Sequence, residues 1–223
     1  MKLYDYAPAP SPRRVRIFLA EKGITVPSVQ VDLRAGEHFG ESFRAVNPDC
    51  TVPVLELDDG TRIADAIAIC VYFEAVRPRP ALMGEDAAEK AVIAAAQRRA
   101  EREGFGAVQD AFRNSTPGLK GHALSGQDVY EQIPALVERG RTRLLRFFAA
   151  MDAALAGRRF VCGDAYSIAD ITTLVTSPNG SRSRSRKNAR TCAAGTTPFA
   201  RARARRRSSR AATPGRLRPS STG

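Results

Sequence analysis

The feature of this sequence that most limits its fold is a change of composition at Thr176. Residues 176–223 contain one Phe, one Leu and no Ile, Val, Met or Tyr. A segment with so few large apolar side chains cannot bury enough surface to offset the entropy that folding removes. We therefore expect the folded domains to lie within residues 1–175 and the tail, residues 176–223, to be disordered.

The tail also carries the whole excess of positive charge. The chain has 35 Lys and Arg against 23 Asp and Glu, and 13 of the basic residues but none of the acidic ones fall in residues 176–223. Residues 1–175 therefore hold 35 − 13 = 22 basic and 23 acidic residues, a net charge of −1. The tail could neutralise phosphates, but it has no interleaved aromatic residues, so we expect at most non-specific nucleic-acid binding. Its composition is also that of a GC-rich coding sequence read out of frame.

Cysteine usage and hydropathy indicate a cytoplasmic protein with reduced thiols. The four cysteines, Cys50, Cys70, Cys162 and Cys192, form no CxxC pair and match no zinc-site spacing. There is no secretory apolar region, and the apolar runs are too short and too often charged to span a membrane. We therefore expect no metal and no membrane association.

Residues 1–80 predict the order β-α-β-α-β-β-α. MKLYDY reads as a strand, and a helix should begin at Ser11 or Pro12 and end at Gly23, a residue that suits a helix C-cap. VPSVQVDL alternates like a second strand, and residues 41–46 suit a short helix. TVPVLELDDGTRIAD predicts a hairpin that turns at Asp59-Gly60, after which Asp65 should cap the helix AIAICVYFEAV.

Residues 86–175 predict an all-α domain after the linker RPRPALMG. One long helix should run over residues 86–109, a loop over 115–126 and a second long helix over 130–155, with apolar residues near helical spacing. SIADITTLV should begin a third helix, since Ser167 and Asp170 are placed like a capping box. That helix stops in mid-pattern at Thr176, so this domain is expected to be incomplete.

Three of these stretches, taken in register, resemble the glutathione transferases. APSPRRVRIFLAEKGI resembles the first helix of that family's glutathione-binding domain, TVPVLELDDGTRIADAIAICVYFE its second half, and FVCGDAYSIADITTLV a central helix of its second domain. The bacterial and fungal branch with an APNPRRVR-like first helix is most similar. The resemblance implies a thioredoxin-like domain over residues 1–80, a helical bundle over 86–175, and a homodimer.

The resemblance also implies that glutathione is a co-substrate and that no other cofactor is needed. Pro53 would follow a cis bond and would turn the backbone of Val52 toward the peptide ligand. Asp65 would receive the α-amino group of glutathione, and the backbone N–H of Ala66 its α-carboxylate. From the residues alone, Asp65 could equally be a plain N-cap and Pro53 an ordinary proline at the start of a strand.

The sequence leaves two interpretations open for the activation of the thiol. The serine of serine-type relatives falls on Ala9, so Ala9 would line the glutathione site without a hydroxyl. Ser11 follows two residues later and could cap the helix with its oxygen or donate its hydroxyl proton to the thiolate. Arg13, which we count among the residues that would bind glutathione, and Arg14 could add positive field at this helix start, or simply be solvated.

The second substrate should sit between the two domains, beside the helix from Asp86 and the loop after it. Phe105, Phe112, Asn114 and Tyr130 are the candidates, although aromatic residues in such places more often belong to a core.

Three functions stay open: a glutathione transferase acting on a small apolar electrophile, a glutathione-binding module without turnover, and a nucleic-acid or anionic-surface binder acting through the tail. Because the helical domain is expected to be incomplete, the sequence leaves the activity of this chain open.

Overall fold

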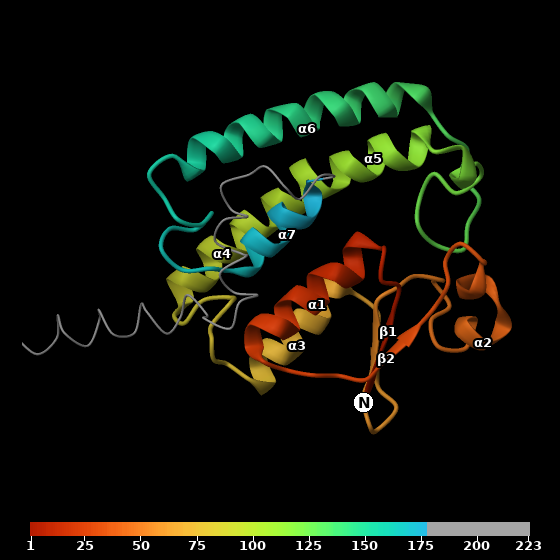
Figure 1. The fold of residues 1–223 in the computed structure, drawn as a ribbon, viewed down its shortest axis with the longest axis horizontal. Helices are drawn as coiled ribbons and strands as arrows, with labels where there is room; N and C mark the ends of the chain where they lie inside the picture. Colours follow the sequence, from red (N-terminus) through yellow and green to blue (C-terminus); the bar gives the residue numbers. More distant parts are fainter. Residues whose placement is uncertain (178–223) are drawn as a thin grey trace, which may run out of the picture. The chain divides into compact units, whose positions relative to one another are not determined.

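Four short strands form one mixed sheet in the N-terminal part of the chain in this computed structural model (Figure 1). The strands are β1 (Lys2–Asp5), β2 (Ser28–Gln30), β3 (Val54–Glu56) and β4 (Arg62–Ile63), in the order β2-β1-β3-β4. β1 pairs in parallel with β2 and antiparallel with β3, which pairs antiparallel with β4. The predicted hairpin is confirmed: Gly60 turns the chain at φ 85°, and Asp59 Oδ1 accepts from the Thr61 N–H at 2.8 Å.

The helices of this part are α1 (Pro10–Lys22), η1 (Glu37–Phe39), α2 (Glu41–Arg44) and α3 (Ala66–Val76), and α1 packs beside α3 (Figure 1). Gly23 ends α1 with φ 63°, as predicted, since a residue without a Cβ adopts this left-handed conformation at little cost. The start was predicted slightly too late: α1 begins at Pro10, whose fixed φ suits the first helical position. This βαβ unit with a following hairpin and helix is a thioredoxin-like arrangement.

The second part is helical throughout. Its elements are α4 (Ala87–Arg99), the π-helical segment η2 (Ala100–Phe105), α5 (Gly106–Ser115), the 3-10 turn η3 (Pro117–Leu119), α6 (Pro134–Leu155) and α7 (Ile168–Thr176). The first predicted helix thus runs on to Ser115, through a π-helical turn. The second begins later than predicted, at Pro134, because Tyr130 is held in a short bridge with the 121–123 loop.

Helix α7 joins the two parts through a shared core. It contacts α1, α4 and η2, and its Ile168 and Ile171 are buried in one cluster with Phe18 of α1 and Ile93 of α4. The predicted capping box at Ser167 and Asp170 is present. Nine residues alone would make a marginal helix, so this packing supplies its stability.

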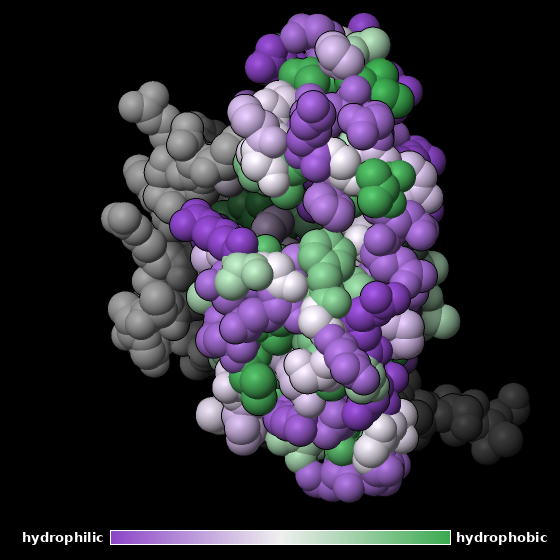
Figure 2. Space-filling view, turned by 90° about the vertical axis from the view of Figure 1, so that its right-hand side faces the viewer, coloured by the Kyte–Doolittle hydropathy of each residue, from purple (hydrophilic) through white to green (hydrophobic). Residues whose placement is uncertain are grey.

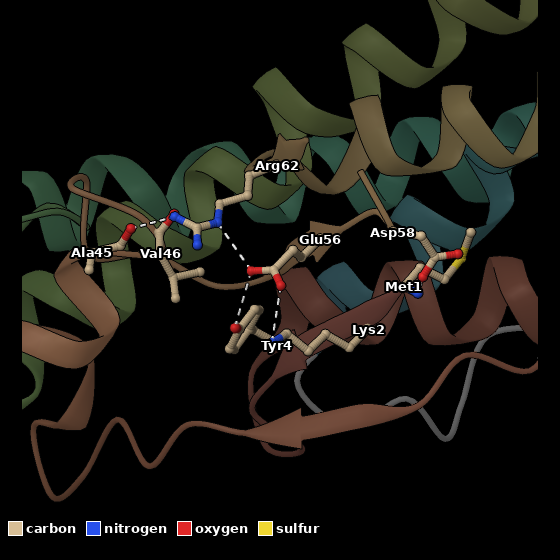
Figure 3. A network of polar contacts seen from close by, with 8 residues as sticks. All are labelled: Met1, Lys2, Tyr4, Ala45, Val46, Glu56, Asp58 and Arg62. Carbon is tan, nitrogen blue, oxygen red and sulfur yellow. Dashed lines mark hydrogen bonds and ion pairs between the residues drawn. The ribbon is translucent and has the colours of Figure 1, made fainter. Parts of the chain in front are cut away.

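A polar network crosses three strands of the sheet (Figure 3). Glu56 on β3 pairs with Lys2 of β1 and with Arg62 of β4, each at 3.1 Å, and it accepts from the Tyr4 hydroxyl at 3.3 Å. These cations hold the pKa of Glu56 below its usual value, the hydrogen bond from Lys2 being the largest cause. Arg62 also donates to the Ala45 carbonyl, so the network ties three strands to the turn after α2.

The structure describes residues 1–177, all within one unit, Met1–Arg186. The predictions about the tail therefore lie outside the described residues. Among the helices that are described, none is both long and apolar enough to cross a bilayer. On the face drawn in Figure 2, apolar residues are scattered among hydrophilic ones.

Candidate functional site

A cavity of about 490 Å³ lies between the thioredoxin-like part and the helical part. The thioredoxin-like part contributes Ser11, Arg14, Thr51, Val52, Pro53, Ala64, Asp65, Ala66 and Ile67 to its lining. The helical part contributes Arg98, Glu101, Arg102, Phe105, Gln109 and Ser125. Three segments singled out in the sequence, at Ser11, Val52-Pro53 and Asp65-Ala66, therefore meet around one space.

The start of α3 keeps a donor and an acceptor for a ligand. Asp65 is its N-cap, and its Oδ1 accepts from the backbone N–H groups of Ile67 and Ala68, both at 2.8 Å. The N–H of Ile69 bonds to the Asp65 carbonyl at 2.9 Å. Within residues 1–177, the N–H of Ala66 and the Oδ2 of Asp65 have no hydrogen-bond partner. Capping thus occupies Oδ1 of Asp65. It leaves Oδ2, and one N–H at the positive end of the helix, free to bind a ligand.

The segment before β3, at Val52 and Pro53, lines the same cavity. The bond between Val52 and Pro53 is cis, as the resemblance implies, and both residues line the cavity. The β1–β3 ladder ends at the pair of Tyr4 and Val54, so Val52 lies just beyond it. Buried Asn47 donates through Nδ2 to the carbonyl and the hydroxyl of Thr51, at 2.9 and 3.0 Å, which fixes the chain leading into Val52.

Ser11 does not cap α1. The N-cap is Ala9, and no side chain bonds to the first-turn N–H groups. Instead, Ser11 Oγ accepts from Arg14 Nη2 at 2.8 Å. A hydroxyl that accepts from a guanidinium still has its own proton to donate. The interpretation of Ser11 as an N-cap is therefore wrong, and the hydroxyl lines the cavity with its proton available.

Arg14 is the largest departure from the sequence-based picture. Its side chain is buried, at 4% exposure for the residue, rather than solvated. Its Nη1 pairs with Glu101 Oε1 at 2.9 Å, and its Cζ lies 4.4 Å from the centre of the Phe105 ring. Both partners belong to η2, so the π-helical turn presents them to α1.

Several predicted site residues lie elsewhere. Among the candidates for the second substrate, Phe105 lines the cavity, whereas Phe112, Asn114 and Tyr130 do not. Helix residues line the cavity from Arg98 to Gln109, before the chain reaches Phe112, which is 57% exposed, and Ser125 of the later loop is the one further lining residue described in this part.

Two of these candidates have structural roles. Asn114 is buried and ties α5 to the start of α6 through the Ile133 N–H at 2.8 Å. Tyr130 is held in the bridge to the 121–123 loop.

Two residues assigned to the glutathione site are also outside the lining. Ala9 is the N-cap of α1, and Arg13 is exposed on that helix. Arg14, one position on, is the residue that reaches the cavity. The sequence did carry a signal for it, because residues three apart share a helix face and Ser11 was already a candidate.

The wall on the helical side lies where the sequence predicted it, but of its residues only Phe105 was named, although the others also carry a sequence signature. In a regular helix, intervals of four, three and four would place Arg98, Arg102, Phe105 and Gln109 on one face, although here the π-helical turn η2 interrupts that face. The wall is polar: among the described residues that form it, Phe105 is the one large apolar side chain, and the Arg14 guanidinium covers that ring. Glu101 is paired with Arg14, so its charge is compensated, while Arg98 has no partner within residues 1–177.

Comparisons with known proteins agree with this architecture. The chain matches the family model described as glutathione S-transferase, N-terminal domain, over residues 9–76, and the corresponding C-terminal domain over residues 134–176. It is 40% identical to "Glutathione S-transferase 2" of Saccharomyces cerevisiae over 176 residues, which are 78% of this chain and 73% of that protein.

Two further comparisons differ in how much they cover. A solved glutathione S-transferase domain-containing protein from Marinobacter aquaeolei shares 42% identity with a TM-score of 0.72, covering 79% of this chain and 84% of that one. A maleylacetoacetate isomerase from Pseudomonas aeruginosa is 41% identical over 93 residues, 41% of this chain and 44% of that protein.

Proposed function

Since this chain belongs to the glutathione S-transferase family, we propose that it binds glutathione in the cavity described above and uses the thiolate to attack a small electrophile. The observation that carries the proposal is the meeting of Val52-Pro53, Asp65-Ala66 and Ser11 around one space. These segments lie far apart in the sequence, and each offers a group that a γ-glutamyl peptide requires.

Binding would use the unpartnered groups of the site. The peptide part of glutathione pairs with the backbone of Val52, in the manner of a short added strand. Its α-carboxylate accepts from the N–H of Ala66 at the positive end of α3, and its α-amino group meets Oδ2 of Asp65. Neither contact requires a change in the capping of α3.

Activation of the thiol needs a modest free energy. A free thiol has a pKa near 8.5, and lowering it to about 6.5 takes roughly 2.7 kcal/mol. A helix N-terminus supplies about 0.3–1 kcal/mol, and a hydrogen bond to a charged group about 1.5–3 kcal/mol. The Ser11 hydroxyl, whose oxygen accepts from Arg14 and whose proton has no acceptor within residues 1–177, is therefore sufficient together with the start of α1.

The polar wall bears on the electrophile. The sequence favoured a small apolar one, but Arg98, Arg102, Gln109 and Ser125 surround the single aromatic ring of Phe105. We therefore propose an electrophile that pairs a compact reactive carbon with a polar or acidic group, since an unpaired Arg98 would favour a carboxylate.

A glutathione-binding module without turnover is the second candidate. It is favoured by Ala9, which stands where serine-type relatives carry their hydroxyl. Two measurements on the full chain separate the two functions: calorimetry with glutathione, and the pH dependence of the ultraviolet absorbance of the bound thiolate. Binding with a thiol pKa of about 6.5 supports a transferase, whereas binding with a pKa near that of free glutathione supports the module. Absence of binding would overturn both.

We also propose that the chain forms a homodimer in a reducing cytoplasm. The described cysteines, Cys50, Cys70 and Cys162, are free thiols, which suits that setting. Sedimentation equilibrium would test the dimer directly.

A further inference from the structure

Arg14, in the first turns of α1, is held on three sides. Its Nη1 meets Glu101 Oε1 at 2.9 Å, its Nη2 donates to Ser11 Oγ at 2.8 Å, and its Cζ stands 4.4 Å above the Phe105 ring. Its Nε is buried and has no partner among the described residues. Burying a charged side chain to 4% exposure is costly, so the contacts that hold it there point to a role in the site.

The contact with Ser11 decides where the hydroxyl proton can go. A guanidinium has five donors and no acceptor, so Ser11 Oγ must accept from Arg14 and its proton must point elsewhere. The first turn of α1 does not compete for that oxygen among residues 1–177, because the Arg13 N–H bonds to the Ala9 carbonyl at 3.2 Å and no side chain caps the helix. Donation from a charged group also polarises the hydroxyl, which strengthens the hydrogen bond that it can give.

The partners of Arg14 come from a distant and unusual element. Glu101 and Phe105 lie on the π-helical turn η2, and both line the cavity beside Arg14. π-Helical turns are rare overall, but those that occur are often found at functional sites, since the extra residue shifts the side chains that the helix presents. Here the turn presents a carboxylate and a ring to the same guanidinium.

We propose that Arg14 is a positioning residue, held by Glu101 and Phe105, that orients the Ser11 hydroxyl so that its proton points into the cavity toward the glutathione sulfur. This inference rests on the proposed function. It assigns to the helical part of the chain a role in activating the thiol, exerted through Arg14. The step is a hydrogen bond alone: the glutathione thiol releases its proton to solvent, and Ser11 donates to the thiolate without losing its own.

Two alternative roles for Arg14 predict different results. Arg14 could act on the thiolate directly through its charge, although the carboxylate of Glu101 at 2.9 Å compensates most of it. Alternatively, the Arg14–Glu101 pair could only join the two parts of the fold. A direct field would act whether or not Ser11 carries a hydroxyl, and a purely structural pair would leave the thiol unchanged.

The experiment is a double-mutant cycle on the full chain, read as the pKa of the thiol of bound glutathione. The variants are Arg14→Lys, Ser11→Ala and the combination. Lys keeps the positive charge but cannot make the forked contact to Ser11 and Glu101. We expect each single variant to raise the pKa of the bound thiol by roughly 1–2 units, the equivalent of the lost hydrogen bond, and the double variant to raise it no further. Ser11→Thr, which keeps the hydroxyl, should retain the sensitivity to Arg14→Lys.

Two controls keep the result interpretable. Arg99→Lys changes an exposed arginine of α4 outside the cavity lining and should leave the pKa of the bound thiol unchanged. Should Arg14→Lys fail to fold, as judged by circular dichroism, Phe105→Leu removes the ring under the guanidinium and takes its place in the same cycle. It should raise the pKa of the thiol only where Ser11 is present.

Three outcomes would overturn the inference. An unchanged pKa in Arg14→Lys would make the pair purely structural. An equal rise with and without the Ser11 hydroxyl would mean that the charge acts directly. If the unaltered chain binds no glutathione at all in calorimetry, the proposed function fails and this inference fails with it, whereas the first two outcomes leave the proposed function intact.

Discussion

Replacing Asp65 separates the two tasks that its carboxylate can have at the start of α3. Oδ1 caps the helix through the N–H groups of Ile67 and Ala68, while Oδ2 has no partner in residues 1–177 and faces the proposed ligand. Asn caps about as well as Asp, whereas Ala in place of either costs about 1 kcal/mol of stability. Asp65→Asn should therefore unfold at nearly the same urea concentration as the unaltered chain, and Asp65→Ala at a lower one.

The affinity for glutathione should depend on the negative charge of residue 65 and not on its capping of α3. Both variants lose the negative partner of the α-amino group, which is worth about 1–3 kcal/mol, or about 5- to 150-fold in Kd. Titration calorimetry measures this, and Asp58→Asn, which removes an exposed carboxylate outside the cavity, serves as the control. If Asp65→Asn binds glutathione as tightly as the unaltered chain, Asp65 is only a cap and the assigned orientation of glutathione is wrong.

Four further measurements test separate features of the molecule. Ser11→Ala should lower kcat/KM less than tenfold, because the start of α1 shares in activation; a hundredfold loss, about 2.7 kcal/mol, in a folded variant would make Ser11 the main activator. Arg98→Ala should lower kcat/KM for a carboxylate-bearing electrophile about two- to fivefold more than for a neutral analogue, as expected for an exposed ion pair, and equal losses would refute the charge preference. Deleting residues 178–223 should abolish salt-dependent retention on DNA while glutathione binding persists, and loss of that binding would show that the tail supports the site. Burial raises the pKa of Asp170 from 3.8 to about 6, although the hydrogen bonds to its carboxylate oppose the shift. The stabilising contribution of Asp170 is therefore complete below about pH 4 and is lost as the pH rises through about 6. Urea unfolding should show this loss of stability, on the order of 3 kcal/mol, in the unaltered chain but not in Asp170→Asn.

The parts of the fold that could be predicted from the sequence depend on local rules. Asp59-Gly60 makes the hairpin because Gly60 takes a positive φ, and Asp65 begins α3 because its oxygen satisfies first-turn N–H groups. The capping box at Ser167 follows from a spacing of three residues. Each of these features involves groups within four positions of one another, so a single stretch of sequence contains the whole physical cause.

Where the sequence permitted two local structures, the predicted start of the helix was wrong. Ser11 is a good capping residue, yet the helix starts earlier at Pro10 and leaves Ser11 inside the first turn. The apolar spacing of the 130–155 region suits a helix throughout, but Tyr130 is recruited by the 121–123 loop, and α6 begins only at Pro134. In both places the sequence pattern permits two structures, and the choice depends on which backbone groups find partners.

The interaction most important for the proposed chemistry is also the one least accessible from the sequence. Arg14 and Glu101 are separated by 87 positions, and nothing in the pattern around either residue indicates the other. Their meeting depends on α7, which is buried against α1, α4 and η2 and so sets how the helical part approaches the start of α1. It depends also on the π-helical turn, because one extra residue in the turn rotates every later side chain relative to an uninterrupted helix. A regular helix over residues 86–115 would present a different face to Ser11. The stripe of Arg98, Arg102, Phe105 and Gln109 is therefore necessary for the wall of the cavity but not sufficient to place Glu101 on Arg14. That placement requires the tertiary packing of α7 as well.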